Sequence, residues 1–250
     1  MPNGICHLSI APVRVLADDT SEMRTQLLYG DHFSILESRK HWSRIRIAAD
    51  GCEGWVCNKQ FSPVSGEDLQ ALEEKNAPAF AADLVSFSST AQNALIPVLL
   101  GSSVGHAEIL GHCFEGSTTR GERGKDQLVD TALLYLNAPY LWGGKTPFGI
   151  DCSGLTQMVY RINGHRLLRN AAEQATQGEA LSFIEESEAG DLAFFDNKEG
   201  AIHHVGIIMN DNYIIHAHGK VRIDRLDHTG IFNTELGRYS HQLRVIKKIL

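Results

Sequence analysis

The chain has 250 residues, a hydrophobic content of 43% and a formal net charge of -7, values typical of a globular protein of one large or two small domains. The negative charge argues against nucleic acid and against anionic membrane surfaces as partners. No apolar run approaches the roughly 20 residues that a membrane span needs. The first seven residues carry neither a basic flank nor an apolar signal core, so we expect a cytoplasmic protein or one whose leader is missing from this sequence.

The five cysteines argue against a disulfide framework, because their number is odd and their spacing shows no pairs. They are Cys6, Cys52, Cys57, Cys113 and Cys152. Cys52 and Cys57 lie close together, but no second pair completes a set of zinc ligands. We therefore expect reduced thiols in a reducing compartment, and we expect neither a metal ion nor a cofactor.

Residues 1 to about 62 show the alternation of short β-strands bounded by Asp, Gly or Pro. The expected strands cover residues 6–10, 13–16, 25–29, 32–37, 42–47 and 54–56. Asp50-Gly51 is typical of a hairpin turn, and it leads into the last of these strands. Five or six short strands in so short a segment predict a small β-barrel.

This order of strands and turns resembles the bacterial SH3-like (SH3b) domain. The segments that carry the resemblance are Pro12-Val13-Arg14, Thr25-Gln26-Leu27-Leu28-Tyr29-Gly30-Asp31, Trp42-Ser43-Arg44-Ile45 and Asp50-Gly51-Cys52-Glu53-Gly54-Trp55-Val56. Some other small barrel is the alternative.

Residues 63–118 are read as a continuation of this β domain, which then covers 1–118, or as a second small module. A short acidic helix is expected over 66–75, broken by Asn76-Ala77-Pro78. A strand and turn are expected over 95–102, and a further strand over 107–114. The polar residues 116–124 are typical of a linker, whose boundaries we place at 119–124.

Residues 125–250 place helices before strands, which predicts an α+β domain with helices packed on an antiparallel sheet. An amphipathic helix is expected over 126–136, a glycine-rich loop over 139–144, a second helix from Cys152 and a short third one ending at Gly178. Strands are expected over 190–195, 203–209, 212–217 and 243–250, with Asp211-Asn212 as a hairpin turn.

Cys152 begins the second helix of this domain, between Asp151 and Ser153. The apolar residues of the helix recur at i, i+3 and i+4: Leu155, Met158 and Val159. Either flanking residue can cap the first turn, where exposed N–H groups and the helix dipole favour negative charge. This position predicts a lowered thiol pKa and a reactive thiolate, and the alternative is a buried, inert cysteine.

His204 and His216 are 12 residues apart, on two strands joined by a tight turn. A hairpin can bring them together on one face of the sheet near Cys152, the arrangement of a papain-like thiol hydrolase. There a histidine takes the thiol proton and a further polar group orients its ring. His203 points to the opposite face of a regular strand. A structural role for these histidines is the alternative.

Five segments resemble, in chain order, the blocks of the NlpC/P60 family of cysteine peptidases. They are Pro139-Tyr140-Leu141-Trp142-Gly143-Gly144, Asp151-Cys152-Ser153-Gly154-Leu155, Gly190-Asp191-Leu192-Ala193-Phe194-Phe195, His204-Val205-Gly206-Ile207 and Ile215-His216-Ala217. The resemblance implies Cys152 as nucleophile, His204 as base and His216 as the orienting third member. It also implies that the Tyr140 hydroxyl lies beside an oxyanion hole to which the Cys152 N–H contributes.

Residues 218–224 and 239–246 resemble the branch of this family that trims murein peptides and carries an SH3b domain ahead of the catalytic one. That branch cleaves the γ-D-glutamyl bond to a diamino acid, L-lysine or meso-diaminopimelate, in peptides with a free N-terminal L-alanine. The resemblance implies that Asp151, Ser153 and Glu22 bind the free amine. Asp151 as a helix cap alone, and Glu22 as a solvated loop residue, are the alternatives.

Two departures from the branch bear on substrate preference. Cys52 stands where relatives often have a tyrosine, and Asn170-Ala171 stands where Asp with Ser or Ala is usual. The resulting expectation is a cytoplasmic, monomeric peptidase that recycles murein tripeptides and tetrapeptides. An exported peptidoglycan DL-endopeptidase that acts on intact wall, and a catalytically silent peptide-binding module, are the alternatives.

Overall fold

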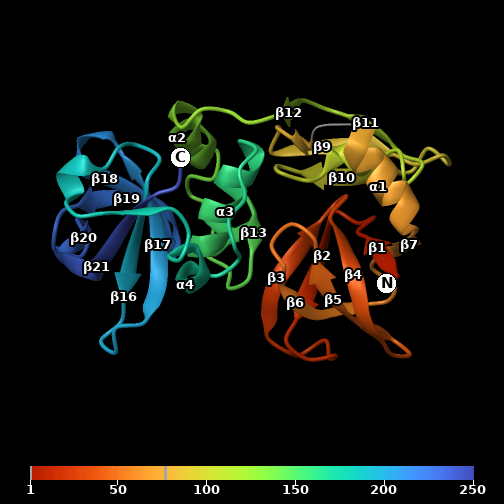
Figure 1. Ribbon diagram of the computed structural model, residues 1–250, viewed down its shortest axis with the longest axis horizontal. Helices are drawn as coiled ribbons and strands as arrows, with labels where there is room; N and C mark the ends of the chain where they lie inside the picture. Colours follow the sequence, from red (N-terminus) through yellow and green to blue (C-terminus); the bar gives the residue numbers. More distant parts are fainter. Residues whose placement is uncertain (1, 76–77) are drawn as a thin grey trace. The chain divides into compact units, whose positions relative to one another are not determined.

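The computed structural model describes residues 2–75 and 78–250 (Figure 1). The chain divides into two compact units, Met1–Glu122 and Arg123–Leu250. Among the described residues, no helix combines the length and the apolar character needed to cross a membrane.

Seven strands of the first unit form one antiparallel sheet in the order β3-β2-β6-β5-β4-β1-β7. They are β1 (Asn3–Ile5), β2 (Ile10–Arg14), β3 (Met23–Leu28), β4 (His32–Ser38), β5 (Trp42–Ile47), β6 (Glu53–Cys57) and β7 (Ser62–Val64). Alternate residues face inward, and Val13, Leu27, Ile45 and Val56 lie in one buried cluster. The expected SH3-like fold is confirmed.

The first strand differs from its expected position over residues 6–10. Asn3–Ile5 pair with β4 and β7 instead. Cys6 lies past the end of this strand, because its N–H donates to the Asp31 carbonyl and its own carbonyl accepts from Gly30. The backbone at Cys6 is thus bonded to the turn after β3 rather than to a neighbouring strand.

The rest of the first unit adds one helix and two small sheets. Its elements are α1 (Gly66–Lys75), β8 (Ala79–Ala81), β9 (Val85–Ser89), β10 (Leu95–Leu99), the 3-10 helix η1 (Val104–His106), β11 (Cys113–Glu115) and β12 (Thr118–Arg120). The sheets are ordered β10-β9-β11 and β12-β8. The strand expected over 107–114 is found only from Cys113, and β12 occupies part of the expected linker. The expected break at Asn76-Ala77 lies outside the described residues.

This segment packs on the SH3-like sheet within the same compact unit, Met1–Glu122. Tyr29, which follows β3, is fully buried in the same apolar cluster as Val98 and Val104. The Tyr29 hydroxyl lies 3.2 Å from Ser88 Oγ and 3.0 Å from His112 Nδ1. A single tyrosine therefore ties the two small sheets to the larger one.

In the second unit, one antiparallel sheet has the order β15-β21-β16-β17-β18-β19-β20, and β20 also pairs with β21. The elements are α2 (Asp126–Leu133), β13 (Lys145–Thr146), β14 (Gly149–Ile150), α3 (Cys152–Ile162), α4 (Ala171–Gln174), β15 (Glu179–Leu181), η2 (Ile184–Glu186), β16 (Leu192–Asp196), β17 (Ile202–Met209), η3 (Asn210–Asn212), β18 (Tyr213–His218), β19 (Lys220–Leu226), β20 (Gly230–Asn233) and β21 (Arg238–Lys248). The β20–β21 pairing closes six strands into a ring, an arrangement that the sequence analysis did not predict. The α+β class is confirmed.

The helix α3 packs against β17 and β18, and every one of its residues is buried (Figure 1). Its polar side chains are bonded internally, for example Thr156 Oγ1, which donates to Gln174 Oε1 over 2.7 Å. Gly154 lets the preceding loop approach the helix closely, since a Cβ there would lie 2.3 Å from the Gly144 carbonyl oxygen. Tight packing therefore sets the position of the first turn of α3.

Candidate active site

Cys152 is the first residue of α3, and Asp151 is its N-cap, as predicted. The Asp151 carboxylate accepts from the Gly154 N–H over 2.6 Å and from the Gly143 N–H over 2.9 Å. Cys152 is buried, and its Sγ lies 4.0 Å from the His203 carbonyl oxygen on β17. The thiol therefore faces β17, the strand that carries His204.

The expected lowering of the thiol pKa is wrong for this resting site. Burial raises the pKa of Cys152 to about 12, and the nearby Asp151 carboxylate adds to the rise. The backbone N–H groups of Val205 and Ser153 and the Arg169 guanidinium favour the thiolate, but they do not outweigh burial. Cys152 therefore rests as a thiol and needs a base when it attacks.

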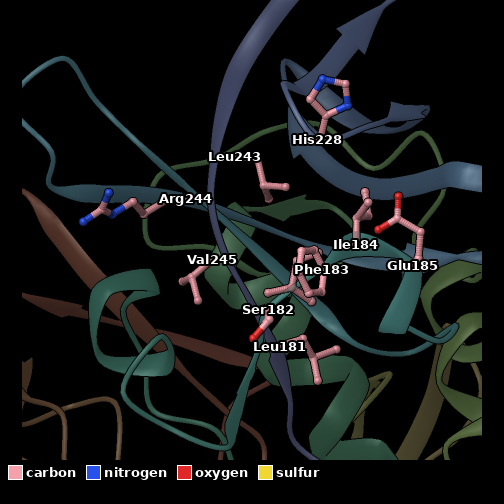
Figure 2. A pocket seen from close by; sticks show the side chains of 10 residues that line it. Leu181, Ser182, Phe183, Ile184, Glu185, His228, Leu243, Arg244 and Val245 are labelled. Atoms are coloured by element: carbon pink, nitrogen blue, oxygen red, sulfur yellow. The ribbon is translucent and has the colours of Figure 1, made fainter.

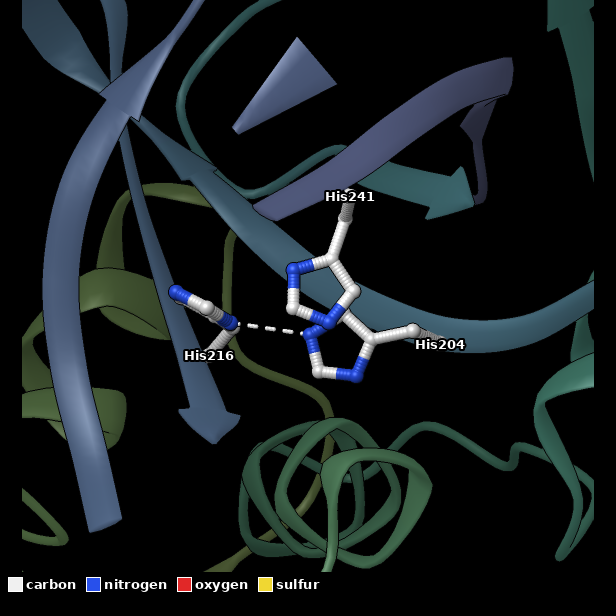
Figure 3. A group of neighbouring side chains, drawn as sticks. All are labelled: His204, His216 and His241. Carbon is white, nitrogen blue, oxygen red and sulfur yellow. Dashed lines mark hydrogen bonds between the residues drawn. The ribbon is translucent and has the colours of Figure 1, made fainter. Parts of the chain in front are cut away.

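His204 lies on β17 and is buried, with its Nε2 2.8 Å from Nδ1 of His216 on β18 (Figure 3). The strand register pairs Gly206 with His216, so the two histidines are diagonal neighbours on one face of the sheet. The thiol contacts the strand on both sides of His204, at the His203 carbonyl and the Val205 N–H. The structure thus brings Cys152, His204 and His216 together.

A β-bulge separates His203 from His204. Phe195 on β16 pairs with His204, and the next residue, Asp196, pairs with Ile202, which leaves His203 as the extra residue. His203 is exposed whereas His204 is buried. The different environments of the two histidines were predicted, but their cause is a bulge as well as strand alternation.

Asp224, which the sequence analysis missed, extends the histidine pair onto β19. Its Oδ2 lies 3.0 Å from His216 Nε2, and Arg222 donates to both of its carboxylate oxygens over 2.7 and 3.0 Å. Burial raises the pKa of Asp224, but the hydrogen bonds from His216 and Arg222 together hold it below its usual value. The sequence signal is an acidic residue at a buried strand position, two residues after an arginine.

These contacts assign the tautomers of both imidazoles. The ionised Asp224 only accepts, so His216 Nε2 carries a proton and His216 Nδ1 accepts. His204 Nε2 is then the donor across the 2.8 Å contact, which leaves His204 Nδ1 with its lone pair. Burial lowers the pKa of His204 well below its usual value, and the neighbouring histidines lower it further, so the imidazole is neutral and its Nδ1 can accept a proton.

His241 on β21 is a further buried histidine at this site. Its ring stacks on His204 with a centroid separation of 4.0 Å and an interplanar angle of 19° (Figure 3). Burial lowers the pKa of His241 to about 3, followed by the effect of His216 and of other histidines. The ring therefore packs as a neutral aromatic against His204.

Asp151 and Ser153 are tied to Arg169, a contact that the sequence analysis did not foresee. Arg169 donates to both Asp151 oxygens over 3.0 and 2.6 Å and to Ser153 Oγ over 3.0 Å. Arg169 is 2% exposed, so this is a buried ion pair beside Cys152. The expected binding of a free amine by Asp151 and Ser153 stays a prediction, and it starts from a carboxylate whose charge Arg169 already balances.

Tyr140 lies in the loop before β13 with 37% of its surface exposed. Its backbone N–H donates to the Gly219 carbonyl, which fixes the loop against the end of β18. Burial raises the pKa of the Tyr140 hydroxyl to about 12, and the charges of Cys152 and Asp151 raise it further. At neutral pH the phenol is therefore a donor within electrostatic reach of the thiol, and its role at an oxyanion hole stays a prediction.

The remaining predicted positions are Glu22 and Asn170-Ala171. Glu22 is an exposed residue of the first unit just before β3, and its carbonyl accepts from the Val15 N–H. Its binding of substrate stays a prediction. Asn170 is the N-cap of α4, and its backbone N–H donates to Glu173. Asn170, which stands where relatives usually have Asp, is therefore still an N-cap residue for α4.

A pocket of about 360 Å³ lies between η2 and β21 in the second unit (Figure 2). Its lining includes Phe183, His228 and Arg244. None of the residues that line it is Cys152 or a member of the histidine cluster. This pocket is therefore separate from the candidate active site.

Two family descriptions match parts of the chain. Residues 137–238 match the NlpC/P60 family, and residues 13–61 match the bacterial dipeptidyl-peptidase Sh3 domain. The first match contains Tyr140, Cys152, His204 and His216, and it ends before His241.

Three curated relatives are similar to the chain. A Bacillus cereus protein named gamma-D-glutamyl-L-lysine dipeptidyl-peptidase is 24% identical over 80% of this chain and 68% of its own length. A Bacillus subtilis protein of the same name is 38% identical over 37% of this chain and 31% of its own length. Dipeptidyl-peptidase 6 of Lysinibacillus sphaericus is 35% identical over 49% of this chain and 42% of its own length. The chain thus spans less than half the length of the last two.

Solved structures show the same fold. An NlpC/P60 family protein from Bacillus cereus aligns over 99% of both chains with a TM-score of 0.79 and 18% identity. An NlpC/P60 endopeptidase from Photobacterium damselae aligns over 97% of this chain and 70% of its own, with a TM-score of 0.70 and 15% identity.

Proposed function

Because this chain is an NlpC/P60 cysteine peptidase with an N-terminal bacterial SH3 domain, we propose that it hydrolyses the γ-D-glutamyl bond to a diamino acid in murein peptides with a free N-terminal L-alanine. The observation that carries the catalytic part is the hydrogen-bonded relay from His204 through His216 to Asp224, with the Cys152 thiol against the strand that carries His204. The names of the relatives support the choice of bond.

In the proposed reaction, His204 Nδ1 takes the Cys152 proton as Sγ attacks the γ-carbonyl carbon. The new imidazolium is stabilised through His216 by the Asp224 carboxylate, which stays ionised. The Cys152 N–H at the helix N-terminus and the Tyr140 hydroxyl stabilise the oxyanion. His204 then protonates the leaving amine of the diamino acid. Water, deprotonated by His204, hydrolyses the thioester and releases the peptide acid and the free thiol.

The substrate amine is proposed to bind at Asp151 and Ser153, with Glu22 as a further acidic group. The Asp151 carboxylate already accepts from Arg169, Gly143 and Gly154, so it offers an ammonium less net charge than a lone carboxylate does. We therefore propose that selection of the free amine needs a further acidic group, and the family resemblance offers Glu22 for this role.

We also propose a cytoplasmic location and the recycling of released wall peptides. The odd number of cysteines and the absence of paired spacing in the sequence support a reducing compartment. Soluble peptides with a free amine, rather than cross-linked wall, are the substrate that this role requires.

The experiment compares L-Ala-γ-D-Glu-L-Lys, its meso-diaminopimelate analogue and the N-acetylated form of each by mass spectrometry of the products. We expect release of L-Ala-D-Glu from the free-amine peptides. Acetylation should lower kcat/KM by roughly two orders of magnitude, because it removes a charge-assisted hydrogen bond worth about 1.5–3 kcal/mol and adds bulk. Equal cleavage of acetylated peptides, or release of fragments from intact wall, would favour the exported DL-endopeptidase instead. No cleavage of any peptide would favour the silent binding module.

A further inference from the structure

Five of the chain's 12 histidines lie against one another at the active site, although the proposed reaction uses two of them. His204 and His216 belong to the relay. His241 is buried against His204, whereas His203 and His218 are exposed, with ring centroids 6.1 and 4.8 Å from that of His241. The relay does not explain the three additional imidazoles.

We propose that His204, His216 and His241 form an inhibitory binding site for a zinc-type divalent metal ion. One ring nitrogen of each residue lies within 4.8 Å of the others (Figure 3). The three residues come from β17, β18 and β21, strands that are separated along the chain and meet in the closed sheet. Three imidazole ligands with an open fourth position suit zinc.

The second nitrogen of two of these rings already has a partner of the kind that supports metal ligands. His216 Nε2 contacts the Asp224 carboxylate, and His241 Nδ1 lies 2.9 Å from Ser240 Oγ. A carboxylate behind a metal-bound histidine fixes its orientation and raises its basicity. These contacts leave His216 Nδ1 and His241 Nε2 to face the ion, together with His204 Nε2.

Metal binding and catalysis exclude each other at this site. Nitrogen ligands of tetrahedral zinc lie roughly 3.3 Å apart, since each Zn–N bond is about 2.0–2.1 Å. The ion must therefore replace the 2.8 Å hydrogen bond between His204 and His216, and the proton held there moves to His204 Nδ1, the nitrogen that the reaction needs as a base. A cation bound to His204 also opposes formation of the imidazolium that the reaction needs. Exposed His203 and His218 give an ion its first ligands at the surface.

Calorimetric titration of the full chain with zinc chloride tests the binding. It uses Cys152→Ala, so that the thiol contributes no ligand, and it contains no substrate, so its result is independent of the proposed bond specificity. We expect one ion per chain and a heat nearly independent of the ionisation enthalpy of the buffer, because three neutral imidazoles bind the ion without releasing a proton. Zinc should also inhibit the unmodified enzyme, and a chelator should restore its activity.

Two variants in the same background separate ligation from packing. His241→Phe keeps the stacked ring without a ligand nitrogen, and His241→Gln removes the ring. Both should weaken zinc binding at least tenfold. His228→Gln is the matched control, since His228 is an exposed histidine outside the cluster and should leave binding unchanged.

Undiminished zinc binding in both His241 variants, or the absence of zinc binding in Cys152→Ala, would overturn the proposal. The second result would assign any inhibition to the thiol alone. Thermal melting of each variant shows that it is folded before it is titrated.

Discussion

Asp224 Oδ2 lies 3.0 Å from His216 Nε2, and this contact determines which nitrogen of His204 can act as a base two strands away. The carboxylate accepts hydrogen bonds and donates none. His216 Nε2 therefore donates to Asp224, and His204 Nε2 donates to His216 Nδ1. Arg222 holds the same carboxylate with two hydrogen bonds and lies between it and Glu235. The relay beyond the thiol therefore consists of His204, His216 and Asp224, and Arg222 holds its end in place.

Asp224→Asn should lower kcat by on the order of 10²–10⁴-fold, because an amide neither fixes the tautomer of His216 nor stabilises the imidazolium. KM should change little, since Asp224 lies behind the histidines rather than beside the thiol. Steady-state kinetics on L-Ala-γ-D-Glu-L-Lys measure both constants. Glu235→Gln, which changes only an exposed partner of Arg222, is the control. Full activity in Asp224→Asn would remove this residue from the relay.

His204→Ala should abolish turnover, whereas His203→Ala should keep most of it. The bulge leaves His203 exposed, and only His204 donates to His216. Initial rates of the two purified variants, with circular dichroism to check folding, give the comparison. The opposite ranking would mean that the bulge lies one residue away from its position in this structure.

The acid limb of the kcat/KM profile should lie well below pH 6.5. His204 acts as a base only when it is neutral, and its lowered pKa keeps it neutral as the pH falls through the usual histidine range. Rates measured in buffers of constant ionic strength test this. A loss of activity centred at pH 6.5 or above would contradict the burial of the base.

The free energy of unfolding should fall as the pH drops below about 6.5. Burial lowers the pKa of His204, His216 and His241 in the folded chain, so the unfolded chain binds more protons below the usual histidine pKa. Their contribution to stability is complete above that pKa and is lost as the pH falls toward the lowered values. Urea unfolding between pH 7 and 4 measures the slope, which His241→Phe should reduce.

Arg169→Met should destabilise the second unit by about 3–5 kcal/mol, because it leaves the Asp151 carboxylate buried beside the helix without its cation. The double variant Asp151→Asn, Arg169→Met should lose less than the sum of the two single changes. Chemical denaturation of all four proteins completes the cycle. Additive losses would show that the pair does not interact as the 2.6 Å contact indicates.

Local pattern was enough to predict several parts of this protein. The apolar period of α3, the position of Cys152 at its start and the capping by Asp151 depend on residues within one or two turns of each other. The strand pair of His204 and His216 follows from a tight turn between two alternating segments. These features are short-range, so neighbouring residues specify them.

Contacts between distant strands decided the rest. Asp224 reaches the site because β19 lies beside β18 in the sheet. His241 reaches it because β21 pairs with both β16 and β20 and so closes the ring of strands. The alternation of residues within one strand does not specify which strands become neighbours. Arg169 reaches Asp151 from a loop 18 residues away. The raised pKa of Cys152 likewise has a tertiary cause: the helix terminus favours the thiolate, but the depth at which α3 is buried outweighs it, and burial is a property of the whole packed unit.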